Sequence, residues 1–180
     1  IEYARAHPGK VAYGTPGVGS PQHLAGEWLS QRTGAGFVHA PYQGAAPATN
    51  DLLAGHVAMG IAGLTSYLQH AAGGRIRILA IGDTARSPDL PDVPTIAETV
   101  PDVIVAGWQG YFAPAGLAAP IRSRLNAAFM RAMRSPKVVE EARKQQFTPV
   151  GSSVEEFERT LRSNTERWRA VVDATGIAEK

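Results

Sequence analysis

The sequence has 180 residues, of which 44% are hydrophobic and 19% charged, and its net charge is +2 at pH 7. This is the composition of an ordinary globular protein with enough chain for a sizeable core, and the weak, dispersed charge argues against nucleic-acid binding. No apolar run reaches the roughly 20 residues of a membrane-spanning helix. The chain contains no cysteine, which excludes disulfides and thiolate chemistry and fits both the cytosol and a secreted protein.

The chain begins at Ile1, without a methionine and inside a segment with helical character that stops at Pro8-Gly9. We therefore expect a processed or truncated protein, whose signal peptide would lie outside this sequence.

Alternating apolar segments and turn signals predict a complete α/β unit over residues 1–106, built from βαβ units around a mainly parallel sheet. The strongest strand signal is Arg75–Ile81, which is rich in isoleucine and leucine. The expected strands are 10–14, 37–40, 57–61 and 75–81, and the expected helices are 1–7, 20–33, 46–53 and 64–72.

The pattern changes after residue 81. Four X-Pro pairs predict an ordered excursion over 82–101 with at most a short helix at 94–99, and 103–112 is expected to be extended. Residues 107–180 then predict a returning strand and helices whose apolar faces need a cover. The expected elements are a helix with Ile121, Leu125, Phe129 and Met133 on one stripe, a helix from Ser135-Pro136 to about Gln146, a short strand at 148–150, and a helix to about Ala174 opened by a capping box at 153–156.

The most informative stretch is Val11–His23, in which a short strand passes through a glycine-rich turn into a helix. Ser20 is expected at the N-cap and Pro21 at the first helical position. Unpaired N–H groups and the helix dipole make such a turn suitable for a carboxylate or phosphate. The turn lacks a Walker lysine and the third glycine of a dinucleotide fingerprint, and a tight turn without a ligand remains the alternative.

Other chemistry has weaker support. Ser20, His23 and Glu27 would be the components of a hydrolase, but no nucleophile elbow is present and the cap already uses the serine oxygen. The five histidines show no metal-ligand spacing. Aromatic and polar residues at strand ends or turns are further ligand candidates, with core packing as the alternative: Tyr42, Trp108, Gln109 and Tyr111.

Four segments, in order, resemble the Bug (TctC-like) solute-binding proteins of tripartite tricarboxylate transporters. They are Tyr13–Glu27, with the family's glycine-rich turn and His-Leu-x-Gly-Glu; His39–Ala48, with His-x-Pro-Tyr-x-Gly; Arg86–Thr95, with Leu-Pro-Asp-Val-Pro-Thr; and Trp108–Gly116, the crossing back to the first lobe.

The resemblance implies a periplasmic binding protein type II-like fold, with residues 1–106 as the second lobe and 107–180 as part of an incomplete first lobe. It implies a periplasmic, non-enzymatic protein that captures a small di- or tricarboxylate or aromatic acid for membrane permease subunits, without cofactor or metal. Self-association through the exposed helices is also expected. The residues predicted to bind the ligand are Thr15, Gly17, Val18, Gly19, Ser20, Ala62, Gly63 and Trp108.

Two departures from the family pattern qualify this prediction. Thr15-Pro16 replaces a serine and a small residue, and Pro16 removes one backbone donor. Ala62-Gly63 replaces a frequent acidic or amide position, which favours a plain acid over an amino acid. A sensing module that signals to a regulator remains the main alternative function, and a hydrolase the lesser one.

Overall fold

The computed structural model describes residues 1–177, which form two compact units. The first unit comprises Ile1–Gly107 together with the end of the chain from Arg169, and the second comprises Trp108–Trp168. The sequence placed 107–180 in one segment, whereas the end of the last helix groups with the first unit. There, the backbone oxygen of Ala174 accepts a hydrogen bond from Nε2 of Gln31 at 2.9 Å.

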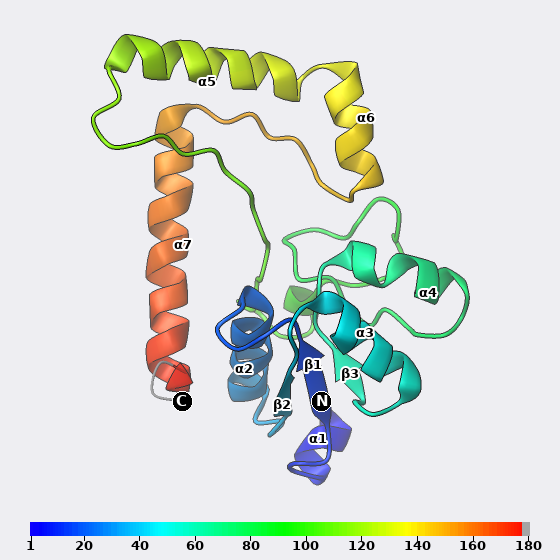
Figure 1. Cartoon of the computed structure of the whole chain (residues 1–180). Coiled ribbons are helices and arrows are strands. Elements are labelled where there is room, and N and C mark those ends of the chain that lie inside the picture. Colours follow the sequence, from blue (N-terminus) through cyan, green and yellow to red (C-terminus); the bar gives the residue numbers. More distant parts are fainter. Residues whose placement is uncertain (178–180) are drawn as a thin grey trace. The chain divides into compact units, whose positions relative to one another are not determined.

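The first unit is built on a three-stranded parallel sheet in the order β2-β1-β3 (Figure 1). In the central strand, Tyr13 lies opposite His39 on one side and Met59 on the other. The expected parallel sheet flanked by helices is confirmed. Its elements are α1 (Glu2–Ala6), β1 (Ala12–Thr15), α2 (Pro21–Thr33), β2 (Val38–Pro41), α3 (Ala45–Ala54), β3 (Met59–Gly60), the 3₁₀ turn η1 (Leu64–Ser66), α4 (Leu68–Ala72) and the 3₁₀ turn η2 (Ile96–Glu98).

Tyr13 carries the contact between the sheet and α2. Its side chain is fully buried, and a methyl group added at Gly26 of α2 would overlap its ring. The absence of a side chain at Gly26 therefore lets the helix lie directly against the tyrosine. The Tyr13 hydroxyl donates to Oε1 of Glu27 at 2.8 Å, and burial together with this carboxylate raises the pKa of Tyr13.

The opposite face of the sheet has no side chains at its centre, because Gly14 and Gly60 are paired across β1 and β3. Two tyrosine rings occupy this space. A Cβ at Gly14 would lie 3.2 Å from Cε2 of Tyr42, and one at Gly60 would meet the hydroxyl of Tyr67. Leu52 of α3 approaches the same Gly60 position at 3.2 Å, so α3 covers this face while α2 covers the other.

The expected strand at 75–81 is wrong. Only Ile81 pairs, in an isolated parallel bridge with Thr95, and Leu79 is 61% exposed. The edge strand β3 has only two residues, Met59 and Gly60, so it offers a further strand little backbone with which to pair. An apolar, β-branched segment favours an extended backbone, but a strand also requires a neighbour with free hydrogen-bonding groups.

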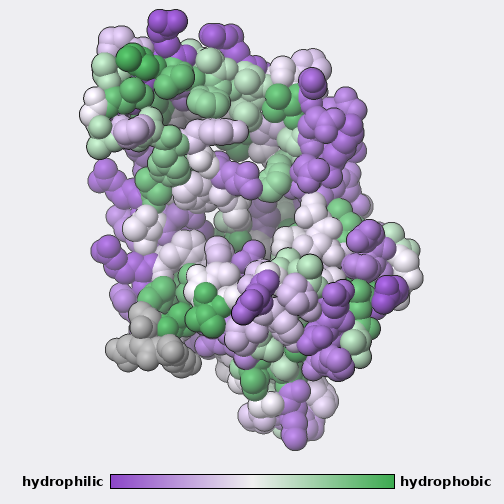
Figure 2. All heavy atoms as spheres, viewed as in Figure 1, coloured by the Kyte–Doolittle hydropathy of each residue, from purple (hydrophilic) through white to green (hydrophobic). Residues whose placement is uncertain are grey.

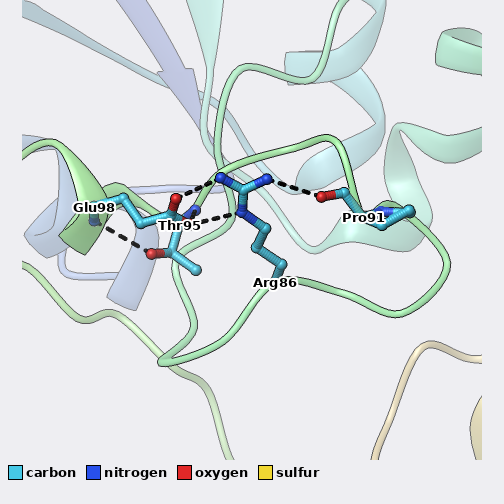
Figure 3. Close-up of polar contacts among 4 residues, drawn as sticks. All are labelled: Arg86, Pro91, Thr95 and Glu98. Atoms are coloured by element: carbon cyan, nitrogen blue, oxygen red, sulfur yellow. Dashed lines mark hydrogen bonds and ion pairs between the residues drawn. The ribbon is translucent and has the colours of Figure 1, made fainter.

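Arg86 stabilises the proline-rich segment over residues 82–101 (Figure 3). Arg86 donates through Nε to Oε1 of Glu98 at 2.9 Å and pairs with the second carboxylate oxygen, while its Nη1 donates to the carbonyl of Pro91 at 2.9 Å. Glu98 also forms a capping box with Thr95 at the start of η2. The Arg86 guanidinium and the Thr95 backbone N–H lower the pKa of Glu98 to about 2.

The second unit contains α5 (Ala119–Met133), α6 (Pro136–Lys144) and most of α7 (Val154–Thr175) (Figure 1). The expected capping box at the start of α7 is confirmed, because the Ser153 N–H donates to Glu156 Oε2 at 2.7 Å and the Glu156 N–H donates to Ser153 Oγ at 3.1 Å. The expected strand at 148–150 is wrong, and the returning segment 107–118 forms no strand either. Among the described residues, neither stretch has a ladder partner in its unit, and Val150 is 78% exposed.

Aromatic packing and an uncovered apolar stripe characterise this second unit. Phe157 of α7 packs edge-to-face against Trp108, and Tyr111 stacks on Phe129 of α5 at 4.4 Å. Ile121 and Leu125 remain 50% and 44% exposed on α5, where Figure 2 shows hydrophobic residues gathered along the helix. None of the helices within residues 1–177 combines the length and apolar character needed to cross a membrane.

Candidate functional site

The glycine-rich turn lies at the carboxyl edge of the sheet, between the end of β1 and the start of α2. Ser20 caps α2 as expected: its Oγ accepts from the backbone N–H of His23 at 3.2 Å and donates to the carbonyl of Gly17 at 2.7 Å. Gly19 has a φ of 74°, a left-handed conformation that side chains disfavour. The local sequence rules therefore account for the shape of the turn.

A second loop leaves the same edge of the sheet beside this turn. The backbone N–H of Ile61 donates to the carbonyl of Gly14 at 2.9 Å, so the chain follows β1 closely before it reaches Ala62 and Gly63. The central strand has β2 on one side and β3 on the other, which is a topological switch point. Ligands of open α/β sheets bind at such a point, outside the carboxyl ends of the strands.

Most amide groups of the turn have acceptors inside the protein. Gly17 N–H donates to Thr15 Oγ1 at 3.3 Å, Gly19 N–H donates to His23 Nδ1 at 3.2 Å, and Ser20 N–H donates to the carbonyl of Gly17 at 3.3 Å. These predicted contact residues thus use their N–H groups to shape the turn.

Two amides remain available for a ligand. Within the described part of the chain, the backbone N–H groups of Val18 and Gln22 have no hydrogen-bond acceptor. Val18 is 67% exposed, and Gln22 lies in the first turn of α2, where the dipole of a 13-residue helix favours an anion. An anion site at this turn stays a prediction, and its free backbone donors would be Val18 and Gln22 rather than four consecutive amides.

Thr15 supports the turn from below. Its side chain is fully buried, and its Oγ1 lies 2.7 Å from Nε2 of His39 on β2. We therefore assign the Thr15 hydroxyl to the support of the turn, while ligand binding by the turn itself stays a prediction.

Sequence reasoning considered His23 only as a component of a hydrolase and did not predict that it packs on His39 beneath the turn. The ring of His23 is stacked on that of His39, with ring centroids 3.8 Å apart and an angle of 16° between the planes. Burial, and after it the neighbouring His23, lower the pKa of His39 to about 4 against the opposing effect of Glu27. The strand register, which pairs Tyr13 with His39 and places His39 on the α2 face, is seen only in the structure.

A hollow of about 370 Å³ adjoins these rings. Its wall combines apolar groups with two imidazoles and one carboxylate. These groups come from the turn, from α2, from β2 and from Phe37, the residue before β2. The lining residues are Val18, His23, Glu27, Phe37, Val38 and His39.

The geometry does not form the hydrolase site considered as an alternative. The Ser20 hydroxyl donates to a backbone carbonyl, His23 Nδ1 accepts from Gly19 N–H, and Glu27 accepts from Tyr13. A nucleophilic serine instead needs its hydroxyl bonded to the imidazole. Among residues 1–177, no three histidine or carboxylate side chains are grouped so as to hold a metal ion.

The aromatic candidates have structural partners. Tyr42 packs over Gly14 and donates its hydroxyl to Asp51 Oδ2 at 2.7 Å, which raises the pKa of Tyr42. Trp108 belongs to the second unit, where it is 40% exposed beside Phe157. Its role at a ligand site, like those of Ala62 and Gly63, stays a prediction.

Comparison with known sequences gives a consistent result. A family model described as "Tripartite tricarboxylate transporter family receptor" matches residues 1–177. The "UPF0065 protein in tcbD-tcbE intergenic region" of Pseudomonas sp. (strain P51) is 37% identical over 174 residues, which cover 96% of this chain and 52% of that protein. Protein BugT of Bordetella pertussis is 37% identical over 181 residues, covering 100% of this chain and 56% of BugT. The chain thus spans about half the length of these curated relatives.

Solved structures agree. "R. palustris Rpa4515 with adipate" superimposes with a TM-score of 0.83 and 32% identity, covering 97% of this chain and 59% of that one. "MatC (Rpa3494) from Rhodopseudomonas palustris with bound malate" superimposes with a TM-score of 0.76 and 25% identity, covering 95% of this chain and 60% of that one.

Proposed function

Because this chain belongs to the receptor family of tripartite tricarboxylate transporters, we propose that it forms a solute-binding lobe for a small carboxylate. The observation that carries the proposal is a pair of amides, Val18 and Gln22, that have no acceptor within residues 1–177 and lie at the start of α2 and at the switch point of the sheet. Two N–H donors at the positive end of a helix match the two oxygens of a carboxylate. A second loop from the opposing lobe, outside residues 1–177, would complete the clamp.

The proposed ligand class is a dicarboxylate, tricarboxylate or aromatic acid. Two structural neighbours carry adipate and malate, which are both dicarboxylates. Ala62 and Gly63 present no charged or amide side chain at the adjacent loop. An α-amino group would find no carboxylate from this loop, which favours a plain acid over an amino acid.

The proposed setting is the periplasm, where the protein would bind its solute without chemical change and deliver it to membrane permease subunits. The family description supports a receptor role. A binding protein of this kind needs neither a nucleophile nor a cofactor.

A paired substitution tests the site. Val18→Pro removes the N–H donor, whereas Val18→Ala keeps it, and the exposed side chain makes either change inexpensive for packing. Thermal unfolding is followed with and without adipate, malate, citrate or benzoate, and a ligand at 100 times its Kd stabilises a protein by about 2.7 kcal/mol.

We expect at least one acid to raise the melting temperature of the wild-type protein and of Val18→Ala, and to raise that of Val18→Pro by less, because only the Gln22 amide remains. Equal stabilisation of both variants would show that this amide does not bind the acid. No stabilisation of the wild-type protein by any acid would count against the proposed function.

We also propose that the exposed stripe of α5 mediates self-association. Ile121, Leu125 and Phe129 are 50%, 44% and 38% exposed and lie along one face, beside a groove of about 580 Å³. Exposed apolar patches of this kind mark contact surfaces. Light scattering should detect a dimer that Leu125→Glu dissociates and that Leu125→Met retains, and a monomer at all concentrations would refute the idea.

A further inference from the structure

Two side-chain acceptors fix the backbone on either side of the Val18 amide. Thr15 Oγ1 receives the N–H of Gly17, and Nδ1 of His23 receives the N–H of Gly19. The Thr15 hydroxyl is in turn bonded to His39, on which His23 is stacked. The conformation around Val18 therefore depends on the two imidazoles beneath it.

We propose that His23 and His39 are positioning residues for the anion site, holding Gly17 and Gly19 so that the intervening amide of Val18 stays free for a carboxylate. This inference rests on the proposed function. The histidines act through the backbone and need not touch the ligand.

The hydrogen-bond geometry assigns a tautomer to His23. A nitrogen that accepts an N–H carries no proton, so neutral His23 holds its proton on Nε2. A protonated His23 would present an N–H to the N–H of Gly19 and break this contact.

His39 makes the second contact. Thr15 Oγ1 has two acceptor lone pairs and one proton, so it can accept Gly17 N–H while donating to Nε2 of His39. In that arrangement His39 carries its proton on Nδ1. Two stacked imidazolium rings would repel each other, which disfavours a doubly charged pair, and the Gly19 contact requires Nδ1 of His23 to carry no proton.

The ionisable groups around the pair come from three elements: Tyr13 on β1, His39 on β2, and His23 with Glu27 on α2. The rings of Tyr13 and His39 are 5.1 Å apart, and the Tyr13 hydroxyl binds Glu27. Glu27 is the one negative charge among these four side chains, and it acts against the neutral state of His39.

The test uses the Gly17 and Gly19 amides as reporters, so that it does not depend on knowing the ligand. In the isotope-labelled protein at pH 7, nitrogen NMR should show His23 Nδ1 without a proton. His23→Leu removes the acceptor, and His23→Asn restores one close to the position of Nδ1. His39→Leu and His39→Gln form the equivalent pair, because the glutamine side chain reaches the position of Nε2. His70→Leu, at a partly exposed histidine of α4, is the control.

We expect the Gly19 amide to exchange about five-fold faster in His23→Leu, and the Gly17 amide to exchange similarly faster in His39→Leu. Exchange should return toward the wild-type rate in His23→Asn and His39→Gln and stay unchanged in His70→Leu. Affinity for malate or adipate should fall and recover in the same order.

Each outcome separates the two proposals. Wild-type exchange rates in folded His23→Leu and His39→Leu would overturn the positioning role, whatever the binding result. If the amides respond as expected while the wild-type protein binds no acid, the positioning role stands and the proposed function fails. If the leucine variants do not fold, the asparagine and glutamine variants decide, and faster exchange in folded forms of both would overturn the inference.

Discussion

Replacing Gly26 by alanine should destabilise the protein, even though alanine is the better helix former. The new methyl group would overlap the ring of Tyr13, which is fully buried, and would come within 2.8 Å of its hydroxyl oxygen. Overpacking of a core costs about 1 to 3 kcal/mol. Displacing the ring also breaks its hydrogen bond to Glu27, and bonds to charged groups contribute about 1.5 to 3 kcal/mol. The gain in helix propensity is about 1 kcal/mol. Together these terms give an expected net loss of about 1.5 to 5 kcal/mol.

Urea unfolding followed by circular dichroism measures this loss. Gly73→Ala is the matched control, because a Cβ there lies 3.5 Å from its nearest neighbour, an ordinary contact, and the backbone has a φ of −83°. The control should stay within about 0.5 kcal/mol of the wild type. If Gly26→Ala proves as stable as the wild type, Tyr13 does not pack against α2 as described.

Three further predictions concern charge and capping. The pKa of His39 is about 4 in the folded protein against an ordinary 6.5, so the unfolded chain binds more protons between these values and stability falls as the pH drops from 6.5 to 4. The full shift in the pKa of His39 corresponds to about 3 kcal/mol of stability, and we expect about 1 to 2 kcal/mol because the ring is partly exposed. Urea unfolding at pH 7 and at pH 4 should therefore show a smaller loss of stability in His39→Gln than in the wild-type protein. Arg86→Gln should raise the pKa of Glu98 from about 2 toward its ordinary 4.5, and an NMR titration in which Glu98 stays near 2 would contradict the ion pair. Ser153→Ala should cost about 1 kcal/mol through loss of the N-cap, measurable by urea unfolding, whereas Ser153→Asp should preserve stability.

Local features, in the site and elsewhere, were predictable from the sequence. The Ser20 cap and the Ser153 capping box follow from the bonding preferences of short side chains at helix starts, and each involves neighbours three residues apart. The parallel sheet followed from the spacing of strands and helices.

The support of the turn was not predictable in the same way. Thr15 and His39 are 24 residues apart, and their contact depends on strand register. The sequence showed the Thr15 hydroxyl without its partner His39, and ligand contact by Thr15 stays a prediction. The prediction of a strand around Leu79 was wrong for a related reason. The residues themselves favour an extended backbone, but a strand also needs a partner that lies elsewhere in the sequence.

The paired glycines of the sheet have a consequence for how this protein tolerates change. At Gly14 and Gly60 the surface of the sheet is supplied by the rings of Tyr42 and Tyr67, which belong to the segments that follow β2 and β3. A larger residue at either glycine would push its ring outward, and with it the segment that carries the ring. Tyr42 also donates its backbone N–H to the carbonyl of Thr15 at 3.0 Å, so such a push would reach the turn around Val18. Substitutions at the centre of the sheet should therefore be tolerated as matched changes of a glycine and its tyrosine, and an unmatched change should first displace the turn around Val18.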